Sequence, residues 1–233
     1  MQINSGARLH VTNASAARLV SVINNDGTIL VQNSTVAYDR PVTISGRYIS
    51  DPSTNTFGSN VTVTVSGTLE GGAGDLFDFR KSLFIQSTNR LGFNLASSDV
   101  LFSGGGNHTN SITGSDFGTN AFYAAANFGY GRLAITNTAD HIFFTSGDLS
   151  SSHGLYAQFV DLLGSSNNVA NLHAPTGINV YYMLSEHDPR NAYLFDQTYT
   201  LNGGGLLLPA VPEPSVIATV LVTALVWRRK RRT

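Results

Sequence analysis

The chain has 233 residues, which is enough for one domain, or two small ones, with a substantial hydrophobic core. Charged residues make up only 12% of it, roughly half the share found in most soluble proteins, whereas 23 residues are glycine and 66 are Ser, Thr or Asn. Because the sequence contains no cysteine, disulfide frameworks, thiolate metal sites, iron–sulfur clusters and thiol nucleophiles are excluded.

The formal net charge of -1 conceals a separation of charge along the chain. Five of the 14 basic residues lie in 228–232, whereas residues 1–211 carry nine basic and 14 acidic residues, a net charge of −5. The acidic body lacks the clustered Lys and Arg side chains that neutralise phosphate groups. We therefore expect no nucleic-acid partner.

Short runs of β-branched residues, separated by glycines, dominate residues 1–87. Such runs occupy 28–31, 42–45 and 61–65, and in the last of them valine alternates with threonine, as in a strand with one buried face. The side chains expected in the core are Val42, Ile44, Val61, Val63 and Val65. Helix is expected to be scarce before the C-terminal tail, with 149–163 as one candidate for a short helix.

The glycines that border these runs recur at a nearly fixed interval. Gly6, Gly27, Gly46 and Gly67 follow one another at steps of 21, 19 and 21 positions. A period of roughly 20 residues is typical of solenoids, in which each coil buries its apolar residues against the next. The sequence therefore predicts an all-β, parallel β-helix or solenoid, with a β-sandwich or jelly roll as the alternative, since sandwiches also place turns at short intervals.

Strand patterns continue after Leu91, although aromatic residues and alanine become more frequent. In 177–184, Ile178, Val180, Tyr182 and Leu184 would share one face of a strand. Because no linker interrupts the pattern, we expect a single β-solenoid domain over 1–205, with longer turns in its second half, and then a linker over 206–211.

The end of the chain has the pattern of a membrane segment. Residues 216–227 are uncharged and largely apolar, and five basic residues follow at once. This order predicts a single transmembrane helix with Trp227 at the interface and the basic end in the cytoplasm. The run would cover about 20 Å of a hydrocarbon core about 30 Å thick, so it is short for a span.

Together with the preceding Pro212, Glu213 and Pro214, this pattern resembles the PEP-CTERM sorting signal of exported bacterial proteins. The likeness extends upstream, because 177–215 is similar to the closing segment of the β-rich members of that group. The resemblance implies that 212–233 is recognised by an exosortase, a membrane enzyme that cuts near the PEP motif. It further implies that Pro212, Glu213 and Pro214 are the recognition element and that the segment from Val216 to Trp227 is the membrane stop. The implied cytoplasmic anchor consists of Arg228, Arg229, Lys230, Arg231 and Arg232.

A C-terminal sorting signal presupposes export, which normally needs an N-terminal signal peptide. Residues 1–17 contain neither the basic region nor the apolar region of such a peptide. We therefore expect that Met1 is not the natural start and that a signal peptide and at least one more coil precede it.

Motifs for catalysis or metal binding are weak. The segment 71–79, GGAGDLFDF, comes close to a calcium-binding nonapeptide, but Asp75 occupies position five instead of position six, so a glycine-rich turn is expected there. Asp75 and Asp78 lie near Arg80 and Lys81, as a polysaccharide lyase would need. In a strand, however, the two carboxylates would point to opposite faces.

Histidine and aspartate also recur near the coil period. His153 and His173 are 20 positions apart, and Asp140 and Asp161 are 21 positions apart, so these residues could stack on neighbouring coils as a metal or general-base site. Solvated turns are the simpler interpretation, as they are for His108 and for 186–189. We therefore expect no catalytic residue, no metal and no cofactor.

The function expected from these patterns is that of a non-enzymatic exported protein, structural or adhesive, at the cell surface or in the extracellular matrix. Its expected partners are the membrane, an exosortase-type enzyme and an extracellular polysaccharide, and its tail would anchor it in the membrane before processing. The alternatives are a β-helix lyase or glycosidase acting on extracellular polysaccharide, and a carbohydrate-binding module. A carboxylate cluster on one face would favour the enzyme, and an aromatic-lined groove would favour the binding protein.

Overall fold

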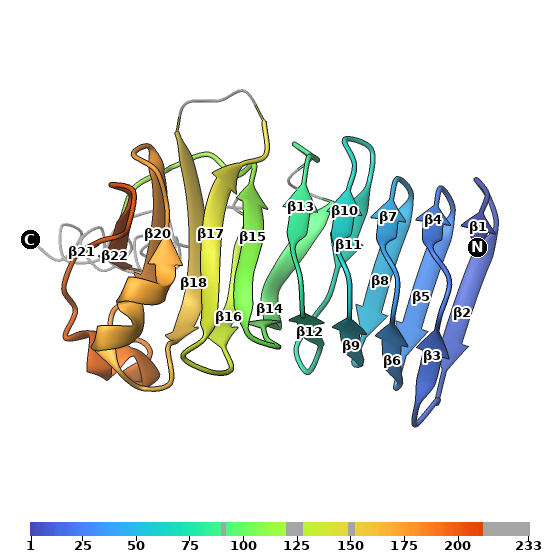
Figure 1. Ribbon diagram of the computed structural model, residues 1–233, viewed down its shortest axis with the longest axis horizontal. Coiled ribbons are helices and arrows are strands. Elements are labelled where there is room, and N and C mark those ends of the chain that lie inside the picture. Colours follow the sequence, from blue (N-terminus) through green and yellow to red (C-terminus); the bar gives the residue numbers. More distant parts are fainter. Residues whose placement is uncertain (90–91, 120–127, 149–151, 212–233) are drawn as a thin grey trace, which may run out of the picture.

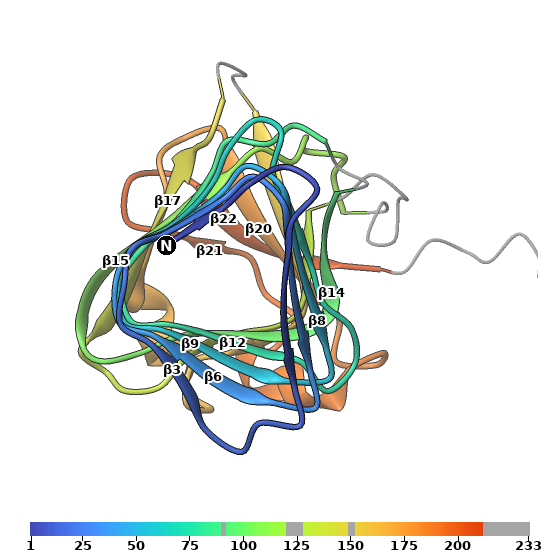
Figure 2. The same cartoon turned by 90° about the vertical axis from the view of Figure 1, so that its right-hand side faces the viewer.

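A computed structural model describes residues 1–89, 92–119, 128–148 and 152–211. The chain winds into a parallel β-solenoid whose coils stack along the long axis of the molecule (Figure 1). Seen along that axis from the N-terminal end, the coils superimpose around one enclosed core (Figure 2). Between the described strands, only β21 and β22 pair in antiparallel fashion. The predicted parallel solenoid is confirmed, and the sandwich alternative is wrong.

One side of the solenoid is an eight-stranded sheet, which we call the first sheet. Its order is β1 (Gln2–Ile3), β4 (Ile23–Asn25), β7 (Val42–Ile44), β10 (Val61–Val63), β13 (Leu83–Ile85), β15 (Gly106–Ile112), β17 (Asp140–Ser146) and β19 (Leu172–His173). Short runs with β-branched residues at alternate positions form these strands in the N-terminal coils, because one side chain in two meets the core.

The second sheet forms the next side. Its order is β2 (Arg8–Thr12), β5 (Thr28–Gln32), β8 (Arg47–Asp51), β11 (Thr68–Glu70), β14 (Phe93–Phe102), β16 (Gly129–Ile135), β18 (His153–Asp161), β20 (Ile178–Met183), β22 (Leu206–Ala210) and β21 (Tyr199–Thr200). A third row closes the N-terminal coils and consists of β3 (Ala17–Leu19), β6 (Thr35–Tyr38), β9 (Thr54–Phe57) and β12 (Leu76–Phe79).

The coil changes shape at β14. This strand pairs with β11 through Phe93 and Asn94 and with β12 through its last four residues, so it spans two sides of the solenoid. The coils that follow contain fewer and longer strands, with 3-10 segments η1 (Ser166–Asn171) and η2 (Pro189–Leu194) at their corners. The longer, less regular turns expected in the second half are present.

The glycine period has a steric cause at one corner of the coil. A Cβ atom on Gly46 would lie 2.1 Å from the carbonyl oxygen of Gly27, and one on Gly67 would lie 2.0 Å from that of Ile44. Because real Cβ atoms do not approach so closely, only glycine allows the coils to stack at this corner.

The core consists of columns in which equivalent residues of successive coils touch. Tyr38, Phe57 and Phe79 stack in one such column, with centroid distances of 4.9 and 5.1 Å between neighbouring rings. Offset or stacked aromatic pairs of this kind add about 0.5–1.5 kcal/mol each to the gain from burial. The expectation that most aromatic residues are core residues is confirmed for this column.

Three expectations about local structure are wrong. Val65 is 69% exposed because β10 ends at Val63 and the chain turns there, whereas the other four predicted core residues are buried. The predicted linker contains β22, which pairs with β20 as a further coil would. The candidate helix over 149–163 is replaced, from His153 onward, by β18, because its residues continue the parallel ladder between β16 and β20.

Candidate functional site

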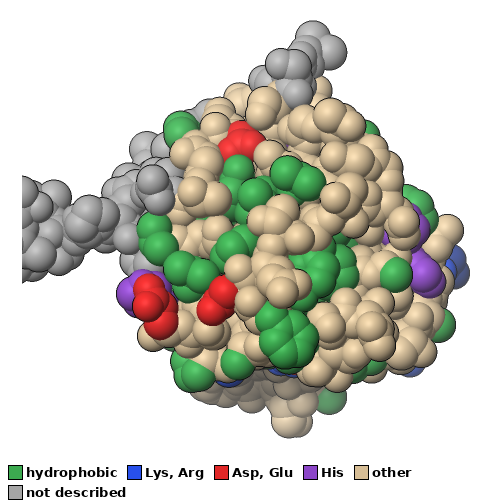
Figure 3. Space-filling view, turned by 90° about the vertical axis from the view of Figure 1, so that its left-hand side faces the viewer, with side chains coloured by type: hydrophobic (Ala, Val, Ile, Leu, Met, Phe, Trp, Pro, Cys, Tyr) green, Lys and Arg blue, Asp and Glu red, His purple; other side chains and the backbone are tan. Residues whose placement is uncertain are grey.

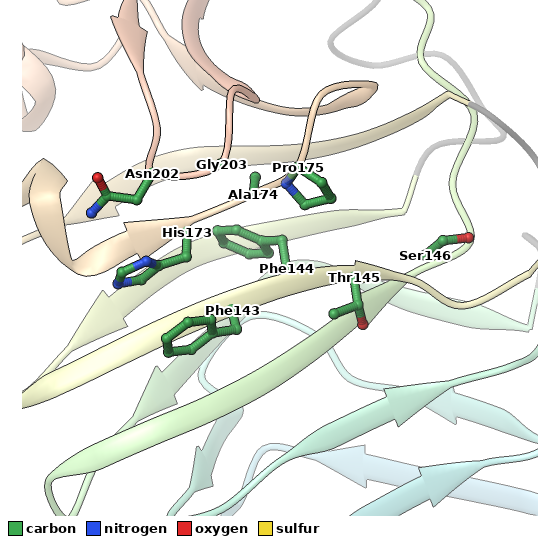
Figure 4. Close-up of a pocket in the computed structure, with 9 residues that line it drawn as sticks. All are labelled: Phe143, Phe144, Thr145, Ser146, His173, Ala174, Pro175, Asn202 and Gly203. Atoms are coloured by element: carbon green, nitrogen blue, oxygen red, sulfur yellow. The ribbon is translucent and has the colours of Figure 1, made fainter.

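A groove of about 520 Å³ lies on the outside of the first sheet, near the C-terminal end of the solenoid (Figure 4). Three segments line it: the end of β17, the end of β19 with the chain that follows it, and the turn before β22. The lining residues are Phe143, Phe144, Thr145, Ser146, His173, Ala174, Pro175, Asn202 and Gly203. Its volume lies within the range of about 300–1,000 Å³ that is usual for ligand sites.

The groove exists because β19 is much shorter than β17. β19 pairs with β17 only through Ile142 and Phe143, and the chain then turns away at Pro175, which has no N–H group to continue a ladder. Among the described strands, none pairs with Phe144–Ser146 on the side of β19. The end of β17 therefore forms an open wall.

Two flat rings form the apolar part of this wall. Ile142 and Phe144 are buried in the core, so Phe143 between them faces outward. Its ring stacks on the imidazole of His173 with a centroid distance of 4.1 Å and an interplanar angle of 8°. Figure 4 shows these two side chains next to each other, with Asn202 beside His173. They offer a flat, half-buried surface to a ligand.

His173 is held by a second imidazole as well. Nε2 of His173 lies 3.2 Å from Nδ1 of His141, which is on β17 and outside the groove lining. Burial, and then repulsion by a charged His141, lower the pKa of His173. The neutral ring is thus favoured at the groove.

The polar part of the groove is uncharged. None of the nine lining residues is Asp, Glu, Lys or Arg. The side-chain amide of Asn202 donates from its nitrogen to the carbonyl oxygen of Ala170 at 2.9 Å, which fixes the amide while its oxygen can accept from a ligand. The groove can therefore hold a ligand by apolar contact and neutral hydrogen bonds.

Ser146 has a histidine partner at the end of the groove. Its Oγ lies 2.8 Å from Nε2 of His153, and Nδ1 of that ring faces the carbonyl oxygen of Gly114 at 3.2 Å. Asp148 approaches the same Nε2 at 3.3 Å, whereas a catalytic triad places its acid on the other ring nitrogen. Ser146 also contacts the backbone carbonyl of Asp148. This contact pattern is that of a hydrogen-bonded turn.

The structure does not bring the predicted His and Asp residues together. His153 pairs in the ladder with Ile178, and His173 pairs with Phe143. Asp161 binds the guanidinium of Arg132 at 2.5 Å on the outside of the second sheet. Among the described residues, no group of three or more His, Asp or Glu could hold a metal ion.

Asp140, the first residue of β17, is buried against His108 on β15. The solvated turns expected for His108 and His153 are wrong, because both side chains are buried on strands. Oδ1 of Asp140 lies 3.2 Å from Nε2 of His108, and both side chains are at most 1% exposed. Burial by itself would raise the pKa of Asp140, but hydrogen bonds from Gly105, Thr136, His108 and Asn137 outweigh it and lower the pKa. No sequence signal reveals this pair, because the two residues are 32 positions apart in coils of unequal length.

The other acidic candidates serve local structure. Asp75 accepts hydrogen bonds from the backbone N–H groups of Ser53 and Gly72, both at 2.7 Å, inside the coil. Asp78 is paired with Arg80 at 3.5 Å, and Asp75 and Asp78 share no hydrogen-bond partner. In 186–189, Asp188 caps η2, which agrees with the turn expected there.

The predicted sorting residues, Pro212, Glu213, Pro214 and the segment from Val216 to Arg232, lie outside the described residues. Within the part of the chain that is described, no helix has the length and apolar composition needed to cross a membrane.

The fold and the groove together define a parallel β-solenoid with an uncharged, ring-lined surface groove. No family model, curated protein or solved structure matches the chain.

Proposed function

We propose that this chain is a non-enzymatic, exported surface or matrix protein whose solenoid adheres to an extracellular polysaccharide through the groove at Phe143 and His173. The observation that carries the proposal is the groove itself, in which an outward-facing ring pair lies next to an amide and two hydroxyl side chains. An aromatic-lined groove is the feature that favours a binding protein over an enzyme.

Sugar rings suit such a surface for a chemical reason. They have faces made of C–H groups, which pack on aromatic rings, and edges made of hydroxyl groups, which bond to amides and hydroxyls. Asn202, Ser146 and Thr145 supply polar groups around the stacked rings of Phe143 and His173. A polysaccharide can continue beyond the groove, because no described strand covers Phe144–Ser146 on the side of β19.

Charge favours a neutral polysaccharide over an acidic one. The groove is lined by no Lys or Arg, and residues 1–211 have a net charge of −5, which repels polyanions. Figure 3 shows the C-terminal end of the solenoid, where hydrophobic side chains lie near the centre of the face and few charged ones surround them. The proposed ligand is therefore a neutral glycan.

The proposed route to the cell surface rests on the tail sequence. Pro212, Glu213 and Pro214, the apolar run to Trp227 and the basic residues 228–232 have the order of a PEP-CTERM signal. A rigid, charge-poor solenoid is a suitable body for such a protein, because it presents a fixed surface at a distance from the membrane.

Binding is tested by sedimentation of the protein with cellulose and chitin, which are neutral, and by affinity electrophoresis in alginate, which is acidic. We expect binding to a neutral glycan, and Phe143→Ala should weaken it about tenfold through loss of ring stacking. Phe195→Ala is the control, because Phe195 is an exposed aromatic residue after η2 that does not line the groove. Equal binding by Phe143→Ala would contradict the proposal, and release of soluble sugar would favour the enzyme alternative.

Sorting is tested separately by fractionation of a host that contains an exosortase. Glu213→Ala should stop processing of a tagged protein while membrane insertion continues, since insertion depends on 216–227 and on the basic residues after it. Normal processing of that variant would remove the sorting proposal and leave the glycan proposal intact.

A further inference from the structure

We propose that His141 and His173 together bind a divalent transition-metal ion, Cu²⁺ or Zn²⁺, at the margin of the groove. This site goes beyond the proposed glycan binding and does not depend on it.

The first argument is the distance between the two ring nitrogens. Nδ1 of His141 and Nε2 of His173 are 3.2 Å apart. Two nitrogens bound to one zinc ion at about 2.0–2.1 Å in a tetrahedral arrangement lie about 3.3–3.4 Å from each other. Adjacent nitrogens in a square-planar copper site lie about 2.9 Å apart at similar bond lengths. The observed separation falls between these values, so the two nitrogens are close enough to bind one ion.

The second argument is that the fold holds both rings in place. β17 and β19 are neighbouring strands in register, and both histidines lie on their outward faces. The His173 ring is stacked on Phe143 at 4.1 Å, which limits its rotation. The two rings are inclined by 47° with centroids 5.5 Å apart, so their nitrogens point at each other as hydrogen-bond partners. Before both can bind one ion, the proton between them must leave and the His141 ring must turn. Because the two strands already hold these side chains close together, binding does not require distant residues to be brought to one place.

The donor set selects the class of metal. Imidazole nitrogen suits copper, zinc and nickel, whereas calcium and magnesium require several oxygen ligands. Among the described residues, no third His, Asp or Glu completes a cluster here. Water or a ligand in the groove would therefore fill the remaining positions, and the site would be open and exchangeable. Copper should bind more tightly than zinc, as the usual order of divalent affinities requires.

The experiment is a calorimetric titration of the full chain with Cu²⁺, Zn²⁺ and Ca²⁺, together with electron paramagnetic resonance of the copper form. We expect the chain to bind Cu²⁺ more tightly than Zn²⁺ and to show no binding of Ca²⁺. The spectrum of the copper form should show two nitrogen ligands. His141→Gln should lower the copper affinity at least about tenfold and remove one nitrogen from the spectrum.

His10→Gln is the matched control, because His10 is an outward-facing histidine of the second sheet whose Nε2 bonds to Gln32 and Thr12. It should leave the site unchanged. The proposal is overturned if His141→Gln binds copper as tightly as the unaltered chain does, or if the copper spectrum of the unaltered chain shows a single nitrogen ligand. Equal melting temperatures of His141→Gln and the unaltered chain would establish that any loss of copper binding is not caused by unfolding.

The metal site and the glycan site fail independently. His141 does not line the groove, so His141→Gln should keep its affinity for the glycan while it loses the metal. Phe143→Ala retains both imidazoles and should still bind copper, although less tightly because stacking no longer fixes the His173 ring, while it loses the glycan. If the chain bound copper but none of the glycans, the metal site would be supported and the glycan proposal would not.

Discussion

The coils before β14 and those after it share the same parallel pairing but differ in regularity. Between β1 and β13, paired residues of successive coils are 19 to 22 positions apart. After β14, the separation varies from 25 positions between β18 and β20 to 35 between β14 and β16. In Figure 1 the N-terminal strands form an even row, whereas the C-terminal ones are longer and carry larger connections.

The difference separates two ways of stabilising a solenoid. Regular coils repeat the same apolar columns and the same glycine corner, so each coil presents to the next coil the same surface for stacking. Both regions bury polar side chains, and the irregular coils add pairs beside their longer turns, such as His108 with Asp140. They also end strands at unequal lengths, which produces the groove beside Phe143. The proposed binding groove therefore lies where the repeat is broken.

The largest expected effect concerns the irregular coils. Asp140→Asn removes the carboxylate from a fully buried network and should destabilise the protein by about 3–5 kcal/mol. Hydrogen exchange should rise in β15 and β17 before it rises in β5 and β8. Asp99→Asn is the control, because its ion pair with Arg132 is partly exposed to solvent and is worth about 1 kcal/mol or less. A uniform rise along the whole solenoid would contradict the division into two regions.

Acid should act on the same network. Because the pKa of Asp140 is lowered in the folded state, its contribution is complete above the pKa of the unfolded chain, about 3.9. It is lost as the pH falls through the lower, folded value. The difference in urea midpoint between the unaltered chain and Asp140→Asn should therefore shrink below about pH 4. A difference that stays constant down to pH 2 would exclude this linkage.

The next effect concerns the glycine corner of the regular coils. Gly46→Ala forces a Cβ against the carbonyl oxygen of Gly27 and should cost about 3 kcal/mol in thermal or urea unfolding. At Gly58 the closest contact would be 3.3 Å, so Gly58→Ala should cost much less. Equal losses for the two variants would mean that the corner tolerates a side chain.

The smallest effect tests where a regular strand ends. Val63→Ala should cost about 2 kcal/mol because Val63 is fully buried, whereas Val65→Ala should change the stability by less than about 0.5 kcal/mol. Urea unfolding of the two variants measures both. If Val65→Ala were as damaging as Val63→Ala, residue 65 would belong to the core.

The sequence predicts the regular coils well because their signals are local. Alternation of valine and threonine over 61–63 marks the strand, and the glycine interval marks the coil. Alternation does not show where a strand stops, so it wrongly assigns Val65 to the core. The linker expected over 206–211 is wrong as well. β22 forms a strand because the edge of β20 is available for pairing, which the residues of β22 alone do not reveal.

The candidate site is harder to predict because it depends on the register between distant coils. Phe143 and His173 are 30 positions apart, which is far from the glycine period, and equal spacing points to His153 and His173 instead. The recurrence of histidine near the glycine period has no meaning in C-terminal coils that are all longer than that period. Only the weak sequence signal of aromatic residues in the second half indicates a ring-lined surface.

By itself, the sequence determined the all-β parallel architecture, the coil length of the N-terminal half and the scarcity of helix. These features follow from side-chain periodicity and from the positions where only glycine fits, which act within a coil or between adjacent coils. The tertiary structure decided the length of each C-terminal coil, the burial of Asp140 with His108 and the approach of His141 to His173. Those pairings depend on how turns of unequal length pack against one another, and this packing involves residues that are far apart in the sequence.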